Sequence, residues 1–144
     1  KQYDRLRFYG LGPEETYADR LHGAKLGVFS RTAAEDCAPY LLPQETGNHE
    51  QVRWAEITDE YGHGMRVTAA GGTRFATSLL PYSSLMLEDV LHQNELPKPR
   101  HTFLRLLAAQ MGVGGDDTWG SPVHDEFQVP ADQPLKLDVT LELI

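Results

Sequence analysis

The end of the chain alternates between apolar and polar side chains with a period of two. The apolar set is Leu135, Leu137, Val139, Leu141 and Leu143, and the polar set between them is Lys136, Asp138, Thr140 and Glu142. Successive side chains of a β-strand point to opposite faces of its sheet. The pattern therefore predicts a strand over residues 135–143, with one face buried and the other in water.

The same period recurs through most of the chain. Further strands are predicted at residues 3–9, 25–30, 51–59, 65–70, 73–80 and 102–109. Gly71-Gly72 separates two of them and predicts a tight hairpin turn. The alternating pattern over 51–59 predicts that Trp54 is buried. The apolar run 102–109 suits a strand buried on both sides, although its leucine spacing suits a helix equally well.

One segment is typical of a helix. Residues 83–93 can begin at a capping serine, carry an apolar stripe at Leu87, Val90 and Leu91, and are followed by two prolines. Many short strands, glycine- and proline-rich turns and one short helix predict an all-β fold, an antiparallel β-sandwich or a barrel. The length of 144 residues is that of one domain or part of one.

Composition argues against two classes of partner. The formal net charge is −8 and the basic residues form no run, whereas nucleic acid and anionic membranes require a basic patch. No apolar stretch approaches the length that crosses a bilayer. Cys37 is the only cysteine, so no internal disulfide can form, and a reducing, cytoplasmic compartment is the simpler expectation.

The most unusual stretch is residues 111–120, which read MGVGGDDTWG. Its glycines allow positive φ or close approach of the backbone, and Asp116 and Asp117 can hold a turn by accepting backbone N–H groups. Trp119 has no apolar periodicity around it. It could plug the end of a sandwich, or it could offer its ring to a ligand such as the C–H face of a sugar. The residues alone favour the plug.

No pattern of residues indicates catalysis or a metal site. Glu14 and Glu15, like the two loop aspartates, are neighbours on a turn, and adjacent carboxylates rarely converge on one sugar carbon. Pairing with Arg20 is the expected role of the glutamate turn. The six histidines lack ligand spacing, and the single cysteine has neither a CxxC partner nor a local base.

Four motifs stand in order along the chain. Residues 9–20 (YGLGPEETYADR) are similar to the pattern G-x-GP-x-E-x-Y-x-DR, and residues 43–47 (PQETG) to P-x-E-x-G. Residues 79–83 (LLPYS), with His92 and Glu95 downstream, match a proline-tyrosine segment, and 111–120 resemble GIGGDDSW with Thr118 where serine is usual. Together they resemble the C-terminal module of the LacZ-type β-galactosidases of glycoside hydrolase family two.

The resemblance implies a galactose-mutarotase-like supersandwich, with residues 1–144 as a single, partial domain from its C-terminal half. The family hydrolyses terminal β-D-galactosides with retention. Its catalytic glutamates and its magnesium and sodium sites belong to a TIM barrel upstream. This chain is therefore expected to contain no catalytic, metal-binding or cofactor-binding residue, to be inactive alone, and to have the remaining β-galactosidase domains as partners.

The family also implies a role for the glycine-rich loop. Its tryptophan forms a platform for the aglycone of the galactoside substrate, such as the glucose of lactose, and this role falls on Trp119. Gly114, Gly115, Asp116 and Asp117 would hold the loop. With the resemblance, ligand contact becomes the favoured interpretation of Trp119.

Two alternatives remain open at this stage. An autonomous carbohydrate-binding module would need exposed aromatic side chains on one sheet face. A purely structural domain would self-associate, with the strand 135–143 as a possible participant, because half a sandwich leaves apolar surface uncovered. The resemblance also leaves open whether the sequence is a piece of one polypeptide or part of a natural small subunit.

Overall fold

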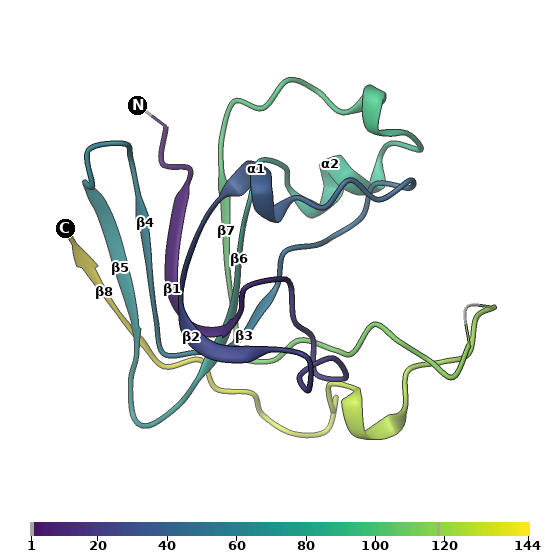
Figure 1. Ribbon diagram of the computed structural model, residues 1–144. Coiled ribbons are helices and arrows are strands. Elements are labelled where there is room, and N and C mark those ends of the chain that lie inside the picture. Colours follow the sequence, from purple (N-terminus) through teal and green to yellow (C-terminus); the bar gives the residue numbers. More distant parts are fainter. Residues whose placement is uncertain (1, 118) are drawn as a thin grey trace.

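The computed structural model describes residues 2–117 and 119–144, and within them eight strands form two antiparallel sheets (Figure 1). The first sheet has the order β2-β1-β4-β5-β8 and the second the order β3-β6-β7. The strands of the first sheet are β1 (Arg5–Gly12), β2 (Lys25–Thr32), β4 (Trp54–Thr58), β5 (Gly64–Ala69) and β8 (Val139–Leu143). Those of the second are β3 (His49–Val52), β6 (Phe75–Leu80) and β7 (Phe103–Leu107).

The described residues also contain four short helical segments: α1 (Ala33–Asp36), α2 (Ser84–Glu88), and the 3₁₀ turns η1 (Gln93–Glu95) and η2 (Asp125–Phe127). The predicted helix is present as α2 but is shorter than expected: it ends at Glu88, so of the predicted apolar stripe only Leu87 is on it and buried, and Leu91 is 68% exposed. Ser83 caps it by accepting a hydrogen bond from the backbone N–H of Met86 at 3.2 Å. Helix α1 is an addition to the prediction. Its sequence signal is the capping box of Thr32 and Glu35, which bond each other's backbone N–H.

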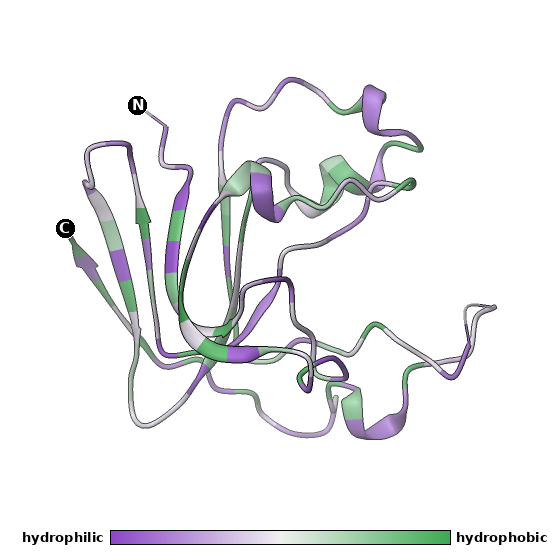
Figure 2. Ribbon diagram, in the orientation of Figure 1, coloured by the Kyte–Doolittle hydropathy of each residue, from purple (hydrophilic) through white to green (hydrophobic). Residues whose placement is uncertain are grey.

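The core lies between the two sheets. Phe8 and Val67 from the first sheet and Val52 and Leu79 from the second are almost fully buried against one another. Buried and more exposed residues alternate along β1 and β4 of the first sheet, so the outer face of these strands is in water (Figure 2). Strand β6 is buried on both faces, because helix α1 also packs on it. The prediction of an all-β antiparallel sandwich is confirmed.

Two predicted connections are wrong. The segment 51–59 is not one strand: it breaks at Arg53 into β3 and β4, which belong to different sheets. Gly71 and Gly72 have positive φ and make a tight turn, but that turn links β5 to β6 across the sandwich instead of forming a hairpin. Alternation within each strand survives such a crossing, which is why the sequence pattern does not reveal it.

The predicted strand 135–143 is shorter than expected and is not buried. Only Val139–Leu143 pairs, with β5, at the edge of the first sheet, and Leu141 and Leu143 are 60% and 90% exposed. An apolar cleft of ≈ 470 Å³ opens between the sheets here, lined by Met65, Leu104 and Leu143 among others. The leucines are exposed because nothing in the described chain fills this gap.

Two further expectations are corrected. Trp54 is only half-buried: it points to the outer face of β4, where the guanidinium groups of Arg7 and Arg66 lie over its ring at 5.3 and 4.6 Å. Residues 103–107 form a strand and not a helix, but this strand is half-buried on both faces because it is at the edge of the second sheet. Within the described residues, no helix is long and apolar enough to span a membrane.

Candidate functional site

The glycine-rich loop leaves the sandwich after β7 and forms a projecting arm with η2 (Figure 1). Two backbone groups fix its stem. The N–H of Gly112 donates to the carbonyl oxygen of Phe127 at 2.9 Å, which closes the arm on itself. The N–H of Gly114 donates to Oδ2 of Asp19 at 2.6 Å, which ties the arm to the segment after β1. The loop is therefore anchored at its base, close to residues of the first motif.

The two loop aspartates have different contacts. Asp117 Oδ1 accepts the backbone N–H groups of Trp119 at 2.8 Å and Ser121 at 3.3 Å, so it holds the turn that carries the indole. These bonds, that from Trp119 first, lower the pKa of the Asp117 carboxyl. Asp116 instead contacts a side chain: its Oδ1 lies 2.7 Å from Nε2 of His124, and this bond raises the pKa of His124.

The glycines of the loop differ in the space around them. A Cβ at Gly115 would overlap the carbonyl oxygen of Ser121, and one at Gly114 would lie 3.2 Å from Asp19 Oδ2. Neither residue has positive φ, whereas Gly120, after the tryptophan, has φ 108°. The overlap explains why a residue without a side chain stands at 115, whereas at 114 the contact is tight and falls on the end of the Asp19 side chain.

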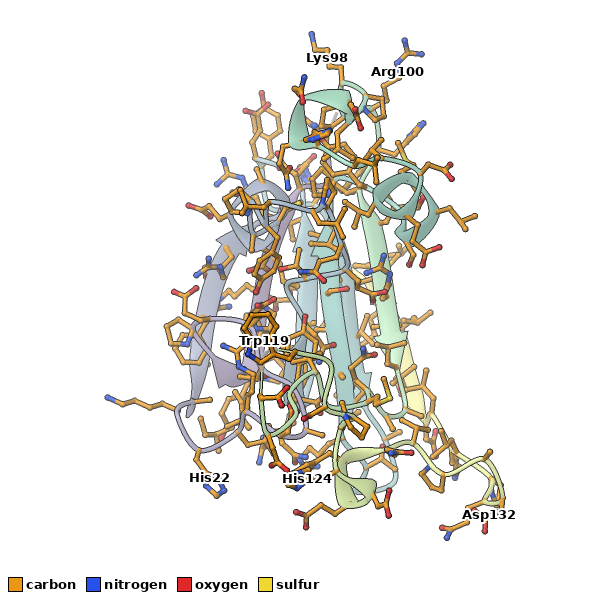
Figure 3. All side chains as sticks on the ribbon, turned by 90° about the vertical axis from the view of Figure 1, so that its right-hand side faces the viewer. His22, Lys98, Arg100, Trp119, His124 and Asp132 are labelled. Carbon is orange, nitrogen blue, oxygen red and sulfur yellow. The ribbon has the colours of Figure 1, made fainter. Side chains whose placement is uncertain are left out.

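Trp119 is 91% exposed, so it does not plug the end of the sandwich. Figure 3 shows its ring on the side of the molecule that faces the viewer, which is the right-hand side of Figure 1, where the loop projects. Thr118, the departure from the motif, lies outside the described residues. An apolar ring of this size, in water on a loop held by a carboxylate, is suited to stack on a flat apolar partner.

The turn that contains Glu14 and Glu15 lies beside the loop and is built around one partly buried carboxylate, that of Glu15. Glu15 accepts hydrogen bonds from the hydroxyls of Tyr17 (3.1 Å), Thr46 (2.7 Å) and Tyr40, and from the backbone N–H of Gly47 (2.9 Å). Burial raises the pKa of Glu15, but the hydrogen bonds together outweigh it and lower the pKa below the ordinary value. Arg20 pairs with Glu15 at 3.8 Å, as expected for this turn.

Glu14 and Glu15 do not converge. Glu14 points to Arg31, with which it pairs at 3.4 Å, while Glu15 is held in the cluster just described. A cleft of ≈ 220 Å³ lies next to that cluster, lined by Arg20, Tyr40 and Gln44, and by Val113 of the loop. Among the described residues, no three histidine, cysteine, aspartate or glutamate side chains are grouped so that they could hold a metal ion.

Sequence reasoning missed two contacts of the loop. Asp19 and His124 were assigned no role, yet each bonds the loop directly. Asp19 belongs to the YADR end of the first motif, so its place beside a family motif was the available signal. His124 offered none, since its partner is eight residues away along an irregular segment.

Comparison with known proteins places these features in a family. Residues 1–141 match the family described as beta galactosidase small chain. The chain is 74% identical over 143 residues to beta-galactosidase BgaC of Bifidobacterium adolescentis, covering 99% of this chain and 14% of that protein. It is 43% identical over 141 residues to a beta-galactosidase of Streptococcus thermophilus, covering 98% and 14%.

A shorter relative carries a more specific name. The chain is 37% identical over 138 residues to the beta-galactosidase small subunit of Latilactobacillus sakei, covering 90% of this chain and 43% of that protein. The chain thus spans only 14% of the length of the first two relatives and less than half of the third. The four ordered motifs, the antiparallel sandwich and a match over residues 1–141 agree: this chain belongs to the beta-galactosidase small-chain family.

Proposed function

We propose that this chain is a non-catalytic, C-terminal part of a retaining β-galactosidase and that Trp119 supplies the platform on which the aglycone sugar of the substrate stacks. The observation that carries the proposal is the indole itself, 91% exposed on a loop that Asp117 and Asp19 fix. The remaining β-galactosidase domains are the partners, and the galactoside reaches this chain from its aglycone side. The single cysteine supports a cytoplasmic location.

On this proposal the chain contributes to substrate binding and not to bond cleavage. Retaining hydrolysis needs two carboxyl groups about 5 Å apart on either side of the scissile bond. Glu14 and Glu15 are directed to different partners, and Asp117 is committed to backbone N–H groups. The chain alone is therefore expected to leave nitrophenyl galactosides intact, and activity should require the catalytic domains. Measurable turnover by the purified chain would contradict the non-catalytic role.

The platform is tested in the full-length β-galactosidase that contains this chain. Trp119→Ala should raise KM for lactose about fivefold and weaken transglycosylation to a sugar acceptor, since a stacking contact contributes about 1 kcal/mol. Inhibition by free galactose, which lacks an aglycone, should change little. Trp119→Phe keeps a flat ring and should recover most of the loss.

The chain offers a matched control in its second tryptophan. Trp54→Phe alters an aromatic residue on the outer face of the sheet and should leave the kinetics on lactose unchanged. Unaltered lactose kinetics in Trp119→Ala would show that the platform does not exist.

One observation favours a second function, an autonomous carbohydrate-binding module. Tyr9 and Trp54 lie 6.5 Å apart on the outer face of the first sheet and are only half-buried. Calorimetric titration of the chain with galactosides distinguishes the two functions. Binding that is lost in Trp54→Ala and kept in Trp119→Ala would favour the module over the platform.

A further inference from the structure

One side chain joins the first motif of the sequence to the last. Asp19 follows β1, and its Oδ2 accepts the backbone N–H of Gly114, 95 residues further along the chain, at 2.6 Å. The same oxygen lies against Gly112, where an added Cβ would stand 2.6 Å from it. A single carboxylate oxygen therefore contacts two residues of the stem that carries Trp119.

The other oxygen of the carboxylate is shielded from water. Oδ1 of Asp19 is buried and has no hydrogen-bond partner among the described residues. The carboxylate is thus partly desolvated, and among the described residues the bond that it accepts comes from the loop. A bond between an ionised acceptor and a backbone N–H is stronger than a neutral one, so this contact is well suited to fix the loop.

The segment around Asp19 does not depend on Asp19 for its own shape. The backbone N–H of Arg20 donates to the carbonyl of Tyr17 at 2.8 Å, and that of Thr16 to the carbonyl of Asn48 at 2.6 Å. Glu15 holds the same turn through its hydrogen bonds to Thr46 and Gly47. Because these bonds already order residues 15–20, the bond from Asp19 acts mainly on its partner, the loop.

We infer that Asp19 is the positioning residue of the Trp119 platform: it fixes the stem of the loop so that the indole is held ready for the aglycone sugar. This inference rests on the proposed function of Trp119. A preorganised ring binds more tightly than a mobile one because less conformational entropy is lost on binding. Asp19 touches no substrate in this arrangement and acts only through Trp119.

A double-mutant cycle in the full-length β-galactosidase tests the inference. Asp19→Ala should raise KM for lactose about threefold, somewhat less than Trp119→Ala, and should leave kcat for a nitrophenyl galactoside nearly unchanged. In the Trp119→Ala background, Asp19→Ala should have no additional effect on lactose, because the ring that Asp19 positions is gone.

Three further variants distinguish loss of the contact between Asp19 and the loop from general destabilisation of the protein. Asp19→Asn retains an acceptor for Gly114 and should recover part of the lactose KM. Gly112→Ala leaves Asp19 in place and disturbs the same contact from the loop side, so it should reproduce Asp19→Ala. Asp59→Ala is the control: Asp59 also accepts backbone N–H groups, of Tyr61 and His63, but in the β4–β5 turn at the opposite end of the strands (Figure 1).

The outcomes separate the two proposals. If Trp119→Ala itself leaves lactose kinetics unchanged, the platform function fails. If Trp119→Ala has its effect but Asp19→Ala and Gly112→Ala do not, the platform stands and the positioning role is overturned. If the effects of Asp19→Ala and Trp119→Ala simply add, Asp19 acts on general stability, which also overturns the inference.

Discussion

Glu15 is a partly buried carboxylate whose pKa is lowered by hydrogen bonds, because their effect outweighs that of burial. Its partners come from three places in the sequence: its own turn, Tyr40, and the segment Thr46–Gly47. A single side chain thus holds together three irregular segments, one of which includes Asp19, the residue that bonds the Trp119 loop. Tyr17 shows the converse effect, since burial and the nearby Glu15 charge raise the pKa of its hydroxyl.

Replacing Glu15 by glutamine should destabilise the chain at neutral pH. The amide accepts weaker hydrogen bonds and leaves donors partly unsatisfied, so the free energy of unfolding should fall by about 1–3 kcal/mol. Chemical denaturation at pH 7 measures the difference.

The pH dependence gives a second test of the same residue. The pKa of Glu15 is lower in the folded chain than its ordinary 4.5. The ionised carboxylate therefore stabilises the folded chain fully above pH 4.5, and this stabilisation is lost as the pH falls through the folded-state pKa. The wild type and Glu15→Gln should therefore converge in stability in acid. A difference that stays constant down to pH 2 would assign the effect of the mutation to packing.

At the scale of elements, the junction between β3 and β4 is where the chain passes from one sheet of the sandwich to the other. Gln51 has φ 57°, the only positive φ among the described non-glycine residues, and the register of β3 against β6 shifts between His49 and Val52. This irregularity turns the chain so that β3 pairs in one sheet and β4, two residues later, in the other. The backbone at Gln51 therefore carries the transition between the layers.

The effect of a substitution at Gln51 on the free energy of unfolding should depend on whether the new residue tolerates positive φ, and not on its polarity. Gln51→Val places a β-branched residue at positive φ and should lower the free energy of unfolding by about 1–3 kcal/mol. Gln51→Gly, which accepts this φ, should remain within about 0.5 kcal/mol of the wild type. Urea denaturation of both variants measures these changes, as shifts of the midpoint at an unchanged m-value. Equal destabilisation by the two variants would show that the Gln51 side chain matters more than its φ.

At the scale of the whole molecule, the most prominent surface is the open edge at β8. Leu141 and Leu143 are exposed beside the apolar cleft between the sheets, and the outer backbone edge of β8 pairs with no described strand. An edge strand with exposed apolar side chains invites pairing with another chain. A second copy of this chain, added edge to edge, is the partner that we expect in isolation.

Two charges should prevent this association. Leu141→Lys combined with Leu143→Lys places like charges along the edge, so the dimer expected for the chain should give way to a monomer. Light scattering at several protein concentrations measures the change, and Leu85→Lys, at a leucine 70% exposed on α2, is the control. A monomeric wild-type chain at all concentrations would contradict self-association.

The sequence by itself determined the local structure. Alternation located most of the strands, a capping serine marked the start of α2, and the glycine-aspartate motif marked the loop that presents Trp119, because these depend on neighbouring residues. The four ordered motifs indicated the beta-galactosidase family, to which the chain belongs.

Only the tertiary structure decided how these elements meet. Sheet membership of β3, β4, β5 and β6 depends on the turn at Gln51 and the crossing at Gly71-Gly72, which leave the alternation unchanged. The bond from Gly114 to Asp19 joins residues 95 apart, and the exposure of Leu143 depends on what lies across the cleft. A periodic pattern tells which face of a strand is apolar; packing between distant segments determines what covers that face.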